Sequence, residues 1–76
     1  MNNSRRARLD EAIALIQRAS GIIDDVCSDE SDALDNLPDG LCDTERAEKM
    51  EQAIDSMNDA VDQLSSAEEL LVAAKE

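Results

Sequence analysis

Residues 35–41 read Asp-Asn-Leu-Pro-Asp-Gly-Leu and divide the chain into two halves of similar length. Proline cannot continue a helix and disfavours the helical conformation in the residue before it, whereas glycine tolerates the backbone angles of a tight turn. The segment therefore predicts a sharp turn, and each flanking half is long enough to form one extended helix.

Each half carries small residues at every seventh position. The first series is Ala12, Ala19, Val26 and Ala33, and the second is Ala53, Ala60, Ala67 and Ala74. If the chain folds back at the turn, residue 12 meets 67, 19 meets 60 and 26 meets 53. Small side chains at this spacing allow two antiparallel helices to approach closely. The two series predict an all-α fold, an antiparallel helical hairpin.

An apolar stripe with alternating three- and four-residue spacings runs beside each series, as on the buried side of a helix. Including the polar residues that share its positions, it comprises Leu9, Ile13, Ile16, Ser20, Ile23, Cys27, Glu30, Leu34 and Leu37, then Met50, Ile54, Met57, Val61, Leu64, Glu68 and Leu71. This predicts a single domain over 1–76, with a helix over about 4–36, a turn over 37–43 and a helix over about 44–75.

Residues that favour helix ends refine these boundaries. Ser4 is the expected N-cap of the first helix, and Asp43 or Thr44 that of the second, with Glu45 in its first turn. Cap-type residues at 28–32 could break the first helix. We expect it to continue, because Ala33 and Leu34 stay in phase with the stripe.

Leu15 and Ile22 add a further apolar column that one hairpin cannot cover. Two hairpins packed face to face would bury this column in a four-helix bundle. A chain of 76 residues is also in the size range where oligomerisation commonly supplements a small core. We therefore expect a homodimer or higher oligomer, with a different protein as the alternative cover for the same surface.

Composition narrows the classes of function. The net charge of −12 argues against direct binding to a nucleic-acid backbone, which calls for a basic surface. No run of about 20 apolar residues could span a membrane, and no apolar segment of a signal peptide follows the basic start of the chain. We expect a cytoplasmic protein.

The sequence gives no support for catalysis, a metal or a cofactor. It has no histidine to serve as a base or zinc ligand, and its adjacent carboxylates, as at Asp24 and Asp25, would point in different directions on a helix. An EF-hand loop starting at Asp35 would carry Leu37 at loop position 3 and Arg46 at loop position 12, where calcium ligands belong. We expect a protein that is not an enzyme.

Two cysteines raise the question of a disulfide. In a continuous hairpin Cys42 would lie at the turn, about 15 Å from the level of Cys27. That separation exceeds the Cα distance of about 7 Å that a disulfide can bridge. We expect two reduced cysteines, with Cys27 acting as a small apolar residue of the stripe.

Three segments of the chain are distinctive: Arg-Arg-x-Arg-Leu at 5–9, Asp-Asn-Leu-Pro-Asp-Gly-Leu at 35–41 and Glu-Arg-Ala-Glu-Lys-Met at 45–50. Together they resemble a group of small acidic proteins from phages and prophages of Gram-positive bacteria. The group's turn typically reads Asn-Leu-Pro-Glu-Ser-Leu-Gln and is followed by Glu-Arg-Gly-Glu-Lys-Met, so Asp39-Gly40, Cys42 and Ala47 depart from it. The resemblance brings no functional residues. It implies a viral context, in which small acidic proteins often inhibit host machinery. If a phage encodes the protein, the expected cytoplasm is that of the host cell.

Two charged clusters are candidate binding sites. The candidate partner-binding residues form an acidic run, Asp24, Asp25, Asp29, Glu30, Asp32 and Asp35. This run could dock on a basic host protein, as a nucleic-acid mimic would, or could simply be a solvated surface. The candidate anion-binding residues are Arg5, Arg6 and Arg8, which could instead pair with the acidic end of the second helix at Glu68, Glu69 and Glu76. Arg46 and Lys49 are expected beside the acidic run.

Three functions follow from these clusters and stay open. The first is a non-enzymatic interaction protein of phage type, which inhibits a host defence or nucleic-acid-handling protein through its acidic surface. The second is an oligomeric sponge for a small anionic ligand or nucleotide. The third is a purely structural helical dimer.

Overall fold

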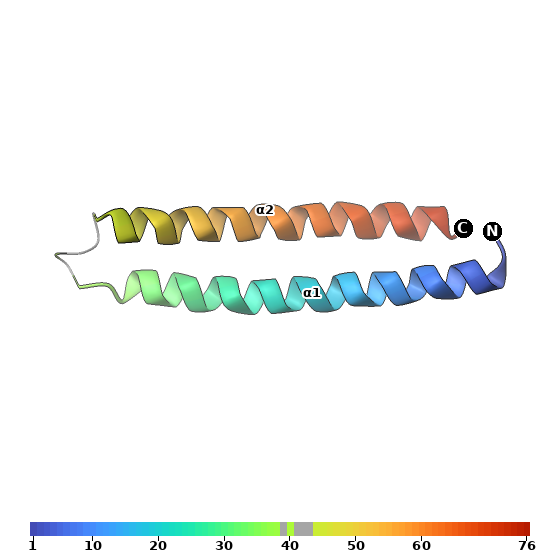
Figure 1. The fold of residues 1–76 in the computed structure, drawn as a ribbon, viewed down its shortest axis with the longest axis horizontal. Coiled ribbons are helices and arrows are strands. Elements are labelled where there is room, and N and C mark those ends of the chain that lie inside the picture. The colour runs from blue at the N-terminus through green and yellow to red at the C-terminus, as the bar shows by residue number, and fades with distance from the viewer. Residues whose placement is uncertain (39, 41–43) are drawn as a thin grey trace.

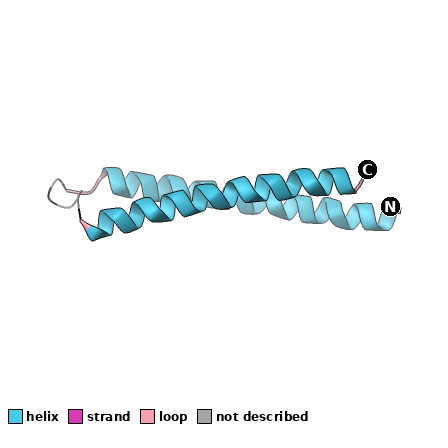
Figure 2. Ribbon diagram, turned by 90° about the horizontal axis from the view of Figure 1, so that it is seen from above, coloured by secondary structure: helices cyan, strands magenta, loops and turns pink. Residues whose placement is uncertain are grey.

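The computed structural model describes residues 1–38, 40 and 44–76. Two helices, α1 (Asn3–Asp35) and α2 (Glu45–Ala74), run antiparallel and place both termini at one end of the molecule (Figure 1). The Cα atoms span 60 × 15 × 11 Å, and the helices cross at a shallow angle (Figure 2). The predicted packing of two antiparallel helices is confirmed. The predictions for Asp39, Leu41, Cys42 and Asp43 fall outside the described residues.

The N-terminus of α1 differs from the prediction. Asn2, not Ser4, is the N-cap: its backbone is extended, and its Oδ1 accepts a 2.8 Å hydrogen bond from the backbone N–H of Arg5. Asparagine caps a helix as well as serine does. Capping at Asn2 places Ser4 inside the helix, which therefore begins one residue earlier than expected.

The first helix is continuous, as predicted, through Gly21 and through residues 28–32. It ends at Asp35, after which Asn36 and Leu37 donate backbone hydrogen bonds to the carbonyls of Asp32 and Leu34. Pro38 explains this end, because it lacks an N–H group and disfavours a helical Leu37.

The second helix begins with a cap that the sequence predicted. Thr44 is the N-cap, and its Oγ1 accepts a 3.4 Å hydrogen bond from the backbone N–H of Ala47. Glu45 and Glu48 lie in the first turn, where the helix dipole favours negative charge. The helix ends at Ala74, with Lys75 as its C-cap.

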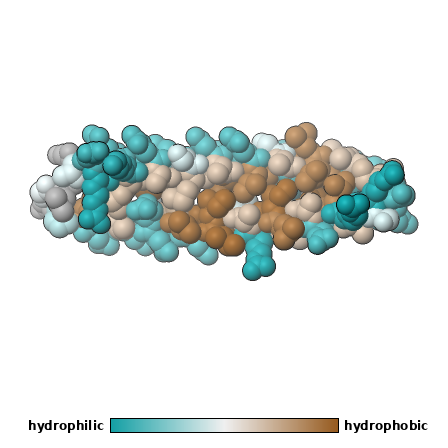
Figure 3. Space-filling model, viewed as in Figure 1, coloured by the Kyte–Doolittle hydropathy of each residue, from teal (hydrophilic) through white to brown (hydrophobic). Residues whose placement is uncertain are grey.

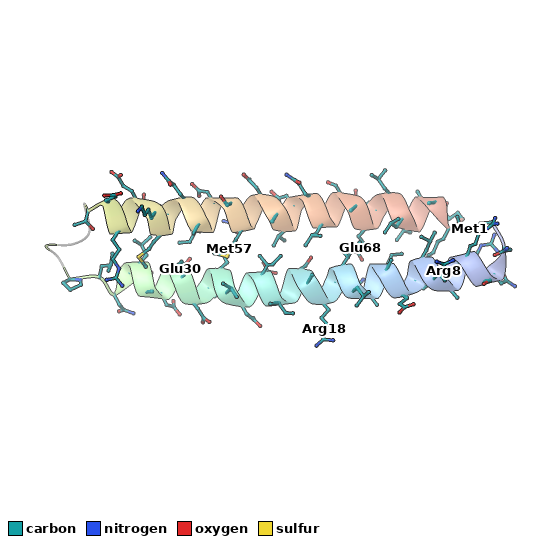
Figure 4. All side chains as sticks on the ribbon, viewed as in Figure 1. Met1, Arg8, Arg18, Glu30, Met57 and Glu68 are labelled. Carbon is teal, nitrogen blue, oxygen red and sulfur yellow. The ribbon has the colours of Figure 1, made fainter. Side chains whose placement is uncertain are left out.

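The two predicted stripes face each other and form the seam of the hairpin. Every stripe residue is buried or half-buried, and Met57 and Glu68 lie between the helices in Figure 4. Burial is nevertheless shallow. Among the described residues only Ile13, at 8% exposure, and Ala47, at 1%, are buried.

The alanine series lie at the edge of this seam. Five of their members are half-buried, namely Ala12, Ala19, Ala53, Ala60 and Ala67. The other three, Val26, Ala33 and Ala74, are exposed, so the expected contact of Val26 with Ala53 does not bury the valine. A side chain beside a two-helix seam is covered from one side only, which leaves Val26 49% exposed.

Candidate functional site

The most extensive candidate site is a surface that we call the apolar face. Three alanines of the two series are each followed, three residues later, by a large exposed side chain: Leu15 after Ala12, Ile22 after Ala19 and Leu70 after Ala67. Residues three apart share one side of a helix. Together with Val26 and Ala60, these residues define the apolar face, and Figure 3 shows apolar residues gathered over both helices between hydrophilic ends.

The exposure of this face is large for its residue types. Leu15 is 59% exposed, Ile22 is 55% exposed and Leu70 is 71% exposed. Single exposed apolar side chains are ordinary, but contiguous ones typically mark a binding surface. Alanines between them keep the surface flat enough for another helix to approach. The sequence had singled out Leu15 and Ile22, and the structure adds Val26 and Leu70.

Charged side chains flank the apolar face along α1. Arg8 and Asp29 continue the seven-residue column of Leu15 and Ile22 in either direction. Both are exposed, and among the described residues neither side chain forms a hydrogen bond or ion pair. The face is therefore basic at the end near the termini and carries an acidic residue toward the turn.

The acidic run covers the second half of α1. Asp24, Asp25, Asp29, Asp32 and Asp35 are exposed, whereas Glu30 is half-buried and lies on the side of α1 that faces α2 (Figure 4). Asp25 and Asp32 follow Arg18 at seven-residue intervals, and Arg18 points away from α2. The structure therefore distributes the run around α1 and does not gather it into one concave site.

Arg46 and Lys49 lie beside the acidic run at Glu30, and the three residues line one shallow hollow. Lys49 forms a 3.3 Å ion pair with Glu45 of its own helix. In the described part of the chain no ion pair joins Arg46 or Lys49 to the run. Residues four apart on one helix are always within reach of each other, so a local partner competes well with one across the seam.

The arginine cluster is divided by the structure. Arg6 is half-buried, and its Nε donates a 2.8 Å hydrogen bond to the carbonyl of Lys75, while Nη2 lies 3.5 Å from the carbonyl oxygen of Glu76. Its guanidinium thus satisfies backbone acceptors at the end of α2, not the acidic side chains that were expected. Arg5 and Arg8 are exposed and line a shallow hollow with Met1 and Leu9.

The edge of the seam opposite the alanine series is polar. Gln17 donates a 2.6 Å hydrogen bond to Glu68, the thiol of Cys27 donates to Asn58 Oδ1 at 3.6 Å, and Lys75 pairs with Asp10. Asp10 and Gln17 each precede an alanine of the first series by two residues, which places them about 200° around the helix from that alanine. Sequence patterns did not indicate these contacts, because they depend on how the side chains extend across the seam.

Over residues 1–38, 40 and 44–76, no group of three or more histidine, cysteine, aspartate or glutamate side chains could hold a metal ion. Cys27 is a free thiol. Neither α1 nor α2 contains an apolar stretch of the length needed to cross a membrane.

No family model, curated protein or solved structure matches the chain.

Proposed function

We propose that this protein acts by binding protein, without catalysis, and that the apolar face is its binding surface. The proposal rests on one observation: the hairpin buries few apolar side chains and leaves several large ones exposed. Among the described residues only two side chains are buried, while Leu15, Ile22, Val26 and Leu70 are all close to half exposed or more. Covering these side chains is the main source of binding free energy available to the chain.

Site-specific photo-crosslinking in cells that express the chain tests this proposal. A benzophenone amino acid in place of Ile22 should form covalent adducts with protein, either a second copy or a different chain. The matched control carries the same amino acid in place of Asp62, an exposed residue that lies about 200° around α2 from Ala60. Adducts at neither position, or equal adducts at both, would contradict a specific role for the apolar face.

A second function, docking of the acidic run on a basic partner, is favoured by the last turn of α1. That turn contains Asp32 and Asp35 and no basic residue. Negative charge at the C-terminal end of a helix opposes the helix dipole, so these aspartates do not serve the stability of α1. Aspartates at this end of α1 suit a surface that steers a basic partner. In the phage context that the resemblance implies, such a partner would be a host defence or nucleic-acid-handling protein.

Charge removal away from the apolar face tests the second function. A variant with Asp24→Asn, Asp25→Asn and Asp32→Asn keeps side-chain size and loses three charges. A partner captured from host lysate should bind this variant more weakly than wild type at low salt, with the difference shrinking as salt rises. Equal binding at every salt concentration would reduce the acidic run to a solvated surface.

The anion-binding alternative now depends on fewer residues. Because Arg6 is engaged at the end of α2, a sponge for small anions would rely on Arg5 and Arg8. Equilibrium dialysis with a nucleoside diphosphate tests this alternative, and loss of any binding in Arg5→Ala and Arg8→Ala variants would support it.

A further inference from the structure

We infer that the apolar face binds a second copy of this chain in antiparallel orientation, with Arg8 of each copy paired to Asp29 of the other. This inference rests on the proposed function and names the occupant of the same surface. It follows from the order of residues in one column of α1, from the charges that flank the apolar face, and from the area that the hairpin exposes.

The column is Arg8, Leu15, Ile22 and Asp29, in which successive residues are seven apart. When the column is set against a reversed copy of itself, opposite charges face each other and apolar residues face apolar residues. When a second α1 lies antiparallel on the first, Asp29 opposes Arg8 and Ile22 opposes Leu15. Two-fold symmetry repeats both contacts, so the dimer gains two ion pairs and two apolar contacts from this single column.

The neighbouring alanine series fits the same arrangement. The centre of the column lies between Leu15 and Ile22, next to Ala19. In an antiparallel pair with that centre, Ala19 meets its own counterpart, and Val26 meets Ala12. A large side chain then lies against a small one at both ends of the contact, while the smallest residues meet at the crossing point, as close helix packing requires.

The two-fold axis also determines which helices meet. A two-fold axis that lies in the plane of the interface, across the length of the hairpin, places α1 on α1 and α2 on α2 of the second copy. Leu70, Ala60 and Ala67 then extend the contact along α2, and the result is a four-helix bundle. Asp25 and Asp32, which share the side of α1 turned away from α2, remain outside the interface.

Charge selects this orientation over the parallel one. In a parallel dimer the two copies place Arg5 and Arg8 at the same end, where like charges repel, whereas the antiparallel dimer places them at opposite ends. Arg8 cannot pair with Asp29 within one chain, because 21 residues of helix separate them by about 32 Å. A second copy in antiparallel orientation gives both side chains a partner of opposite charge.

The exposed area agrees with a dimer. One chain of 8.3 kDa exposes 5601 Å² of accessible surface, whereas a globular monomer of that mass exposes about 4,600 Å². The excess of about 1,000 Å² is comparable with the roughly 800 Å² that each partner buries in a standard interface. Covering the apolar face once would bring the chain to an ordinary exposed area.

Reciprocal charge reversal tests the inference, with dimer dissociation constants measured by sedimentation equilibrium at fixed ionic strength. Arg8→Glu should weaken self-association about tenfold, and Asp29→Arg should do the same, since each places two like-charged pairs in the dimer. The double variant restores opposite charges, so its dissociation constant should return to within about threefold of wild type. Within one chain the two residues are too far apart for the rescue to be intramolecular.

Matched controls separate this pairing from general repulsion between chains of net charge −12. Arg18→Glu changes the net charge as Arg8→Glu does, but lies off the apolar face, and should weaken association far less. General repulsion predicts that Asp29→Arg and the control Asp25→Arg both associate more tightly than wild type. The pairing predicts instead that Asp29→Arg associates more weakly, whereas Asp25→Arg does not. Circular dichroism checks that each variant is helical.

Three results would overturn the inference: tighter association of Arg8→Glu, a double variant no better than the single ones, or a wild-type chain that stays monomeric at 100 μM. The photo-crosslinking test distinguishes these failures from failure of the proposed function. Adducts between position 22 and a different protein, with a monomeric purified chain, would reject the homodimer and keep the apolar face as a binding surface.

Discussion

Gln17 and Glu68 are joined across the hairpin by a 2.6 Å hydrogen bond, in which Gln17 Nε2 donates to Glu68 Oε1. Glu68 occupies a stripe position that is apolar in most other turns of α2, and it is half-buried there. The bond therefore gives a polar group at the seam a partner in the other helix. It also ties α1 to α2 at one level, which helps to fix how the two helices are aligned.

A double-mutant cycle tests the contribution of this bond to stability. Gln17→Ala and Glu68→Ala should each destabilise the fold, and their effects should be coupled by about 0.5–1 kcal/mol, because the bond is partly exposed to water. The measurement is urea unfolding at one fixed chain concentration. Gln52→Ala with Glu69→Ala serves as a control pair, and coupling there as large as between Gln17 and Glu68 would argue against a specific bond.

The cap of α1 gives a second prediction. Because Asn2 accepts the hydrogen bond from the Arg5 N–H, Asn2→Ala should destabilise the fold by about 1 kcal/mol. Ser4→Ala removes the residue that the sequence suggested as the cap, and it should change stability by only a few tenths of a kcal/mol in an exposed helical position. Thermal unfolding followed by circular dichroism compares the two variants. A larger loss from Ser4→Ala than from Asn2→Ala would contradict the structure.

Gly21 lies inside α1 on an exposed position, and a Cβ atom added there would meet nothing within 4 Å. Replacing glycine by alanine in a helix interior removes backbone freedom from the unfolded chain. Gly21→Ala should therefore stabilise the protein by up to about 1 kcal/mol. Urea unfolding measures the gain, and a loss of stability would show that the backbone at this point departs from a regular helix.

Removing charge from the aspartates at the end of α1 should raise the stability of the hairpin, whereas removing a charge from a salt bridge usually lowers stability. Asp32→Asn and Asp35→Asn should each stabilise the hairpin by about 0.3–1 kcal/mol, because each removes negative charge from the C-terminal end of the helix. Glu48→Gln, in the first turn of α2, should destabilise it by a similar amount for the converse reason. Both effects should shrink in high salt. Destabilisation by both aspartate substitutions would mean that these carboxylates have stabilising partners in the folded state.

Particular residues show how far the sequence determined the fold. The three- and four-residue spacing from Leu9 to Leu37 predicted the buried side of α1, because periodicity records which side of a helix is covered. Pro38 predicted where α1 ends, for a steric reason that needs no tertiary information. The Asn2 cap was missed because asparagine and serine cap helices about equally well, so capping preference does not choose between two nearby positions.

The candidate site was less predictable. Leu15 and Ile22 stood out because they lie beyond the width of a two-helix seam. Arg6 did not reveal its role, because a backbone carbonyl as acceptor leaves no mark in the sequence. The pairing of Lys49 with Glu45 was also open, since several carboxylates are within reach of a long, flexible side chain.

The central claim is that a second copy of the chain covers the apolar face and thereby stabilises the hairpin. Thermal unfolding of the wild-type chain, measured over a hundredfold range of concentration, tests that claim most directly. Since dissociation accompanies unfolding, the midpoint should rise by about 5 °C or more from the lowest to the highest concentration. A cooperative transition with the same midpoint at every concentration would show a hairpin that is stable alone, and would contradict the claim.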